Sequence, residues 1–210
     1  MKKRRLAIGL DETNNGFRIG NKHHPFLIVT GYLGLDGGGY GTPKYGSKQR
    51  RKFFGKNPKK TSRILQCAKT YLGEHQDFYY TVIHQKDAHS IDLSKANAVA
   101  ALTFKFFQEY DINPEQTILF LDEMDGEASS GFINEVLQSW LDIAGLGKTE
   151  HRSIRKTIQR STKRKQVIKT ADMIGYYIAA LKFLGGRTHW PFRSRKVNLN
   201  QLEQMAADIR

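Results

Sequence analysis

The sequence predicts an α/β fold, in which strands alternate with helices around a central sheet. Short apolar runs at residues 6–10 and 117–121 have the length and composition of buried strands. Segments with helical apolar periodicity separate the strands. The chain has 210 residues, of which 39% are hydrophobic, and this is enough to bury a sizeable core. We therefore expect a sheet with parallel neighbours, flanked by helices.

Composition excludes several classes of protein. No run of about 18 apolar residues exists, so we expect no membrane span. The apolar run after the basic N-terminus is too short for a secretion signal. The single cysteine, Cys67, rules out an internal disulfide and a multi-cysteine zinc site, and it favours a reducing, cytoplasmic location. The net charge of +14 indicates a polyanionic partner, with nucleic acid as the first candidate.

The first strand ends in two carboxylates, Asp11 and Glu12, and a turn at residues 14–16 follows at once. The carboxyl end of a strand is where α/β proteins tend to place their chemistry. Successive strand side chains point to opposite faces. Both acids therefore reach one site only if the backbone bends after Asp11, a bend that the turn favours. The alternative interpretation is a solvated acidic strand end.

Residues 25–33 predict a second strand, and the preceding His23 and His24 are assigned to a loop. A basic insertion at residues 36–60 follows, with tyrosines and phenylalanines among its lysines and arginines. Cations neutralise phosphates and aromatic rings stack on bases, which favours nucleic-acid contact over a merely solvated loop. Its candidate binding residues are Lys44, Lys48, Arg50, Arg51 and Lys52. Residues 41–48 misplace the lysine of a phosphate-binding loop, so we expect no nucleotide cofactor.

The middle of the chain repeats the design of the first strand. Three elements come before that second acidic strand. They are a helix that begins at Thr61 or Ser62, a strand at 78–84, and a helix at 95–110 with Ser94 as its cap. The strand at 117–123 then ends in Asp122 and Glu123. Parallel neighbours place their carboxyl ends at one edge, so we expect Asp11 and Asp122 to lie close together. A helix at about 129–143 follows.

The last third of the chain combines a basic segment with the most apolar helix. Residues 148–169 contain a possible strand within 151–159 and a loop at 161–165. The candidate nucleic-acid-binding residues there are Arg155, Lys163, Arg164 and Lys165. Thr170 is expected to cap a helix at 171–184, with Asp172 in its first turn. Acids favour helix N-termini for electrostatic reasons, so a structural role and a functional role for Asp172 both stay open. Residues 187–210 form a basic tail with a short helix at about 199–209.

Three separate elements thus carry carboxylates: the strand ending in Asp11 and Glu12, the strand ending in Asp122, and the helix containing Asp172. Clustered acids repel one another unless a cation lies between them. Mg²⁺ and Mn²⁺ are the hard, oxygen-preferring ions that suit such a cluster. Two such ions about 4 Å apart clamp a phosphodiester, activating water on one side and stabilising the leaving oxygen on the other.

At this point the sequence resembles the ribonuclease H-like superfamily, and most closely type 2 ribonuclease H. Residues 9–16, which read G-L-D-E-T-N-N-G, match the first-strand motif G-x-D-E-x-x-x-G. Ile91-Asp92 before an alanine-rich helix, the strand ending in Asp122, and Lys169-Thr170-Ala171-Asp172 are similar to the later motifs and follow in the same order.

The resemblance implies a mixed central sheet flanked by helices, spanning residues 1–186. It also implies that Asp11, Glu12, Asp122 and Asp172 bind Mg²⁺ or Mn²⁺ in a nuclease that leaves a 3′-hydroxyl. The Gly-Arg-Gly that senses the ribose 2′-hydroxyl in that family is absent, so RNA, DNA and hybrid substrates all stay open. A catalytically inactive nucleic-acid-binding module and a strand-transfer or junction-resolving enzyme are the alternatives.

Overall fold

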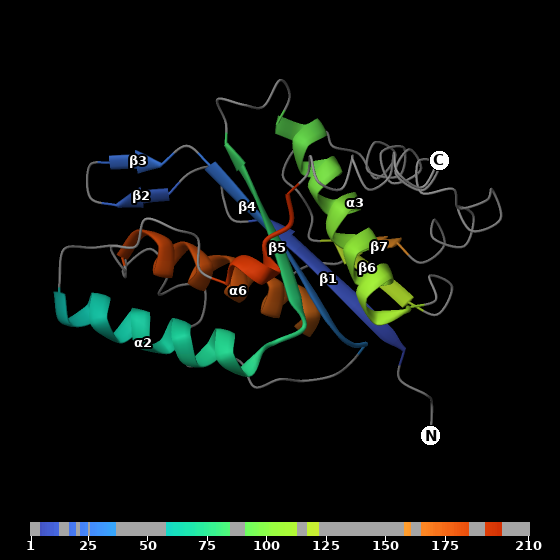
Figure 1. The fold of residues 1–210 in the computed structure, drawn as a ribbon, viewed down its shortest axis with the longest axis horizontal. Helices are drawn as coiled ribbons and strands as arrows, with labels where there is room; N and C mark the ends of the chain where they lie inside the picture. Colours follow the sequence, from blue (N-terminus) through green and yellow to red (C-terminus); the bar gives the residue numbers. More distant parts are fainter. Residues whose placement is uncertain are drawn as a thin grey trace.

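The computed structural model shows a central sheet with helices on both faces (Figure 1). The residues that the structure describes are 5–12, 17–19, 22–24, 26–36, 58–84, 91–112, 117–121, 158–160, 165–184 and 192–198. No helix within these ranges has the length and apolar character of a membrane-spanning segment.

Five strands form the central sheet in the order β5-β4-β1-β6-β7. Their bounds are β1 Leu6–Glu12, β4 Phe26–Leu35, β5 Phe78–His84, β6 Thr117–Leu121 and β7 Ile158–Arg160. β1 and β5 run antiparallel to β4, whereas β6 runs parallel to β1 and β7 parallel to β6. The predicted α/β fold with parallel neighbours is therefore confirmed, and the sheet is mixed.

Helices bury the sheet from both sides. α3 (Ile91–Tyr110) packs on β4 and β5, while α6 (Gln166–Leu184) packs on β1 and β4 on the other side (Figure 1). α2 (Pro58–Glu74) lies against α6. Because strand side chains alternate, Ile8 and Leu10 belong to the core under α3, and Ala7 belongs to the core under α6. Burial on both faces explains why β1 is apolar without a break.

Several element boundaries differ from the sequence expectations. The helices predicted to start at residues 61–62 and 95 begin at Pro58 and Ile91. Assigning His23 and His24 to a loop is wrong, since they belong to β3 (Lys22–His24), which pairs with β2 (Phe17–Ile19) in a small antiparallel sheet.

Other predicted segments lie outside the described residues. These are the helices expected at 129–143 and 199–209, and most of the basic insertion at 36–60. The described part of the strand expected within 151–159 is β7, which begins at Ile158. The division of the chain after residue 186 stays a prediction.

The start of α6 corrects the interpretation of Asp172. The helix begins at Gln166, so Thr170 is not its cap; the Thr170 hydroxyl instead donates a hydrogen bond to the Gln166 carbonyl at 2.9 Å, within the helix. Counted from Gln166, Asp172 is the seventh residue, and the first turn contains no acid. The helix dipole acts mainly within the first turn, so it does not account for this carboxylate.

Gly9 allows α6 to lie directly on β1. A Cβ atom at this position would come within 2.3 Å of the Val167 carbonyl carbon and 2.6 Å of the Ile168 nitrogen. Both atoms belong to the helix backbone, which does not yield as a flexible side chain does. Gly9 is thus required by the close approach of a helix to a strand.

We expect Gly9→Ala to lower the free energy of unfolding by about 3 kcal/mol or more, because strand and helix backbones must separate. Urea unfolding of purified protein measures the change. Gly73→Ala is the matched control: it makes the same chemical change near the end of α2, where a Cβ meets nothing within 4 Å. That variant should be more stable than the wild type by about 0.5–1 kcal/mol. Equal midpoints for Gly9→Ala and the wild type would contradict the close packing.

Candidate functional site

Asp11 lies at the carboxyl end of β1 and is only 3% exposed. The backbone N–H of Glu12 donates a hydrogen bond to Asp11 Oδ1 at 2.8 Å. Alternation along β1 puts Asp11 on the same face as Ala7 and Gly9, which is the face that α6 covers. The backbone thereby directs a buried carboxylate toward the side of the sheet that carries α6.

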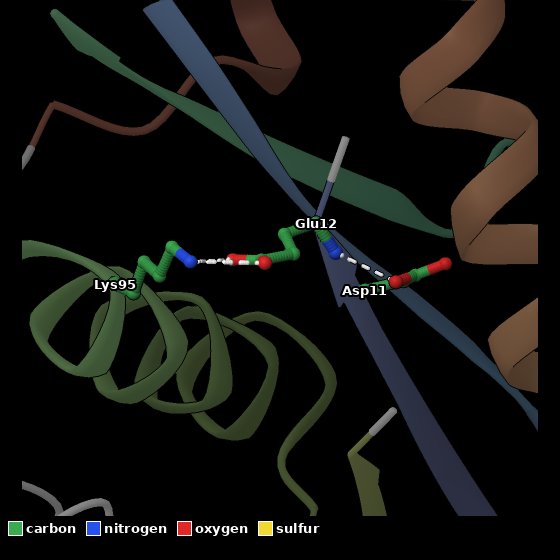
Figure 2. Close-up of polar contacts among 3 residues, drawn as sticks. All are labelled: Asp11, Glu12 and Lys95. Carbon is green, nitrogen blue, oxygen red and sulfur yellow. Dashed lines mark hydrogen bonds and ion pairs between the residues drawn. The ribbon is translucent and has the colours of Figure 1, made fainter. Parts of the chain in front are cut away.

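Glu12 points the opposite way, toward α3 (Figure 2). Lys95 Nζ of α3 lies 2.9 Å from both Glu12 Oε1 and Glu12 Oε2. The two side chains are 6% and 17% exposed, for Lys95 and Glu12 respectively. The expectation that the chain bends after Asp11 is wrong, because β1 stays regular through Glu12, which pairs with Val29. The metal-ligand role predicted for Glu12 therefore requires its carboxylate to leave Lys95.

Asp172 is also buried, at 8% exposure, and belongs to α6, the helix whose backbone packs against Gly9 of β1. Its charge reaches the neighbouring helix α2: burial raises the pKa of Tyr71 to about 12, a hydrogen bond with Thr170 opposes the rise, and the Asp172 carboxylate adds to it. The Tyr71 ring stacks on His75 at a centroid distance of 4.1 Å. Asp11 and Asp172 thus lie on the same side of the sheet.

Asp122, the fourth predicted acid, lies outside the described residues. Leu121, the residue before it, pairs with Leu10, the residue before Asp11, across the parallel strands β1 and β6. The prediction that these two strands are parallel neighbours is confirmed up to the Leu10–Leu121 pair. The proximity of Asp122 to Asp11 stays a prediction.

Metal binding needs more ligands than the described residues supply by themselves. Within that part of the chain, no group of three or more histidine, cysteine, aspartate or glutamate side chains is arranged to hold a metal ion. Asp11 and Asp172 supply two carboxylates on one side of the sheet, and carboxylate oxygen is the donor that Mg²⁺ and Mn²⁺ prefer. The predicted metal site, which Asp122 would have to complete, stays a prediction.

Of the predicted nucleic-acid-binding residues, the structure describes Lys165. Its Nζ lies 3.1 Å from Asp36 Oδ1 and 4.4 Å from the centroid of the Phe120 ring. Its side chain is 39% exposed, so intramolecular contacts hold a cation that solvent still reaches. The other predicted nucleic-acid-binding residues lie outside the described ranges; they are Lys44, Lys48, Arg50, Arg51, Lys52, Arg155, Lys163 and Arg164.

Sequence reasoning missed Lys95. A signal for it exists, because this lysine directly precedes Ala96 in a helix whose next turns are apolar, and a charged residue there needs a buried partner. The identity of the partner has no local signal, since Glu12 is 83 positions away.

Compared with known proteins, the chain matches no family model and no curated protein. The geometry of the site is therefore the basis for inferring what this protein does.

Lys95→Met should lower the free energy of unfolding by about 3 kcal/mol, because it leaves the Glu12 carboxylate against an apolar helix face. Adding Glu12→Gln to Lys95→Met should recover part of this loss. Lys105→Met is the control, since it breaks the more exposed Lys105–Glu109 pair of the same helix and should cost about 1 kcal/mol or less. Urea unfolding measures all four proteins, and similar losses for the two lysine variants would contradict a buried ion pair.

Asp172→Asn should lower the pKa of Tyr71 from about 12, because removing the negative charge makes the phenolate less unfavourable. Fluorine NMR of protein containing 3-fluorotyrosine, which ionises at lower pH, measures the difference between variant and wild type. Tyr71→Phe assigns the signal, and Glu74→Gln provides a comparison because Glu74 has a weaker influence on the same group. An unchanged Tyr71 titration in Asp172→Asn would place the carboxylate elsewhere.

Proposed function

We propose that this protein is a divalent-metal-dependent nuclease of ribonuclease H-like fold that hydrolyses phosphodiester bonds in nucleic acid. The observation that carries the proposal is Asp11, a carboxylate buried at the carboxyl end of the central strand, on the side of the sheet where α6 provides the buried Asp172. Carboxylate oxygens are the donors that Mg²⁺ and Mn²⁺ prefer, so two acids on one side of the sheet supply ligands of the right chemistry for such an ion.

The architecture is compatible with this proposal. A mixed sheet with helices on both faces is what a ribonuclease H-like fold requires, and the chain has that arrangement. β6 runs parallel to β1 and approaches its carboxyl end at the Leu10–Leu121 pair, with Asp122 next in the sequence. Of the four acids that the resemblance singles out, Asp11 comes from β1, Asp172 comes from the helix that packs on β1, and Asp122 follows β6 in the sequence.

Asp11, Asp122 and Asp172 would hold Mg²⁺ or Mn²⁺. The bound metal would activate water and stabilise the leaving oxygen of the phosphodiester. The Glu12 backbone N–H orients the Asp11 carboxylate, and Lys95 neutralises the Glu12 side chain on the opposite face. The net charge of +14 would attract the polyanionic substrate from solution.

A nucleic-acid-binding module without catalysis is the second candidate. The observation that favours it is the Lys95–Glu12 ion pair, which engages one of the four predicted ligands. A strand-transfer or junction-resolving enzyme would use the same acids, and products that are joined as well as cut would identify it.

We expect Mg²⁺-dependent cleavage of labelled DNA, RNA or hybrid oligonucleotides, with Asp11→Asn and Asp172→Asn each reducing the rate by about 100-fold or more. The metal contributes several kcal/mol to the transition state, and each 1.36 kcal/mol is tenfold in rate. Asp111→Asn is the matched control, because this exposed residue has a φ of 46°, a conformation that asparagine accepts.

Gel analysis of the products, with and without EDTA, gives the readout. Metal-independent cutting, or equal rates for Asp11→Asn and Asp111→Asn, would contradict the nuclease assignment. Salt-sensitive binding with no cleavage of any substrate would favour the binding module.

A further inference from the structure

A segment near the end of the chain lies along β5, the edge strand of the sheet. After the short helix η3 (Arg193–Arg195), Lys196 forms an isolated parallel bridge with Tyr80, and the Val197 N–H donates to the Tyr80 carbonyl at 2.8 Å. The segment therefore continues the row of the sheet in which Tyr80 lies.

That row leads to the candidate site. Asp11 pairs with Thr30, Thr30 pairs with Tyr80, and Tyr80 pairs with Lys196. Strands lie 4.7–4.9 Å apart, so three steps place the Lys196 and Asp11 backbones about 14 Å apart. Paired residues share a face, and Tyr80 belongs to the core under α6, so the row from Asp11 to Lys196 is on the α6 side.

Cations gather around Lys196. Burial lowers its pKa, and the positive charges of Lys182 and Arg193 lower it further. Lys182 is in the last turn of α6, whereas Arg193 begins η3 and Lys196 is its C-cap, with the Lys196 N–H donating to the Arg193 carbonyl at 3.1 Å. Like charges held close together create a positive potential that favours a bound anion.

Helix α6 connects the two places. Ten residues separate Asp172 from Lys182, and a rise of 1.5 Å per residue makes this about 15 Å. The row across the sheet and the length of the helix therefore give the same spacing between the buried acids and the cations. Measured along the axis of a duplex, where each strand has one phosphate per about 3.4 Å, this spacing corresponds to about four nucleotides.

We propose that Lys182, Arg193 and Lys196 form a phosphate-binding site for the backbone of the nucleic-acid strand whose scissile phosphate lies at Asp11 and Asp172. This inference rests on the proposed nuclease function. The cluster fixes the position of the strand and contributes to affinity without reading its sequence, because its ligand is a backbone phosphate.

The test compares two double variants of the full chain. Lys182→Gln/Lys196→Gln removes two charges from the cluster, and Arg63→Gln/Lys69→Gln removes two exposed charges from α2. Fluorescence anisotropy with labelled 20-base-pair DNA and RNA/DNA duplexes, in EDTA and at several salt concentrations, measures binding apart from catalysis. We expect the cluster variant to bind about fivefold or more weakly, with a salt slope shallower by about 1, and the α2 variant to stay near the wild type.

Equal losses in the two variants would mean that only net charge matters and would overturn the site. Binding of a polyglutamate peptide with the same dependence on Lys182 and Lys196 would assign the cluster to an acidic protein partner instead, and would also overturn it. Thermal unfolding of both variants verifies that they are folded.

Failure of the phosphate site and failure of the nuclease proposal give different results. If the wild type cleaves nucleic acid and the cluster variant binds like the wild type, the phosphate site alone is wrong. If the wild type never cleaves but the cluster variant still loses duplex binding, the nuclease proposal is wrong and the cluster remains a phosphate-binding site.

Discussion

The contact between Gly9 and the start of α6 is the constraint on which this side of the molecule depends. A helix backbone lies against a strand backbone there, at a distance that leaves no room for a side chain. Asp11 follows Gly9 by two residues on the same face, and Asp172 follows Val167 by five residues along the helix. The positions of both carboxylates are therefore consequences of one backbone contact, which is less adjustable than side-chain packing.

The alternation of β1 decides what the adjacent acids do. Because the strand stays regular through Glu12, the carboxylates of Asp11 and Glu12 leave the backbone on opposite faces. Lys95 compensates the charge on the α3 side. This separation keeps the charge of Glu12 away from Asp11 and Asp172 on the α6 side, and like charges repel less when they are farther apart. The ion pair thus also influences the electrostatics of the opposite face.

Sequence predicted the parts of the fold that have a strong local pattern. β1, β5 and β6 are apolar runs buried in the sheet, and their type and approximate position could be derived from that pattern alone. The start of α6 could not be derived, because Lys165 and Lys169 belong to a basic segment and Thr170 has the chemistry of a helix cap. The pairing of Lys95 with Glu12 could not be derived from a local pattern either, since the two residues are far apart in the sequence. Asp11 and Asp172 became candidates because carboxylates next to apolar segments are conspicuous, and their role in a site stays a prediction.

The sheet and α6 together make the candidate site part of a rigid frame. Hydrogen bonds between strands fix the row from Asp11 to Lys196, and the helix fixes the distance from Asp172 to Lys182. Neither of these two backbone distances changes unless the secondary structure breaks. A site held together only by loops or side chains would not have distances fixed in this way. The ligand that we propose for this frame should therefore carry regularly spaced charges. A nucleic-acid strand has that regularity, because its phosphates repeat at a constant interval.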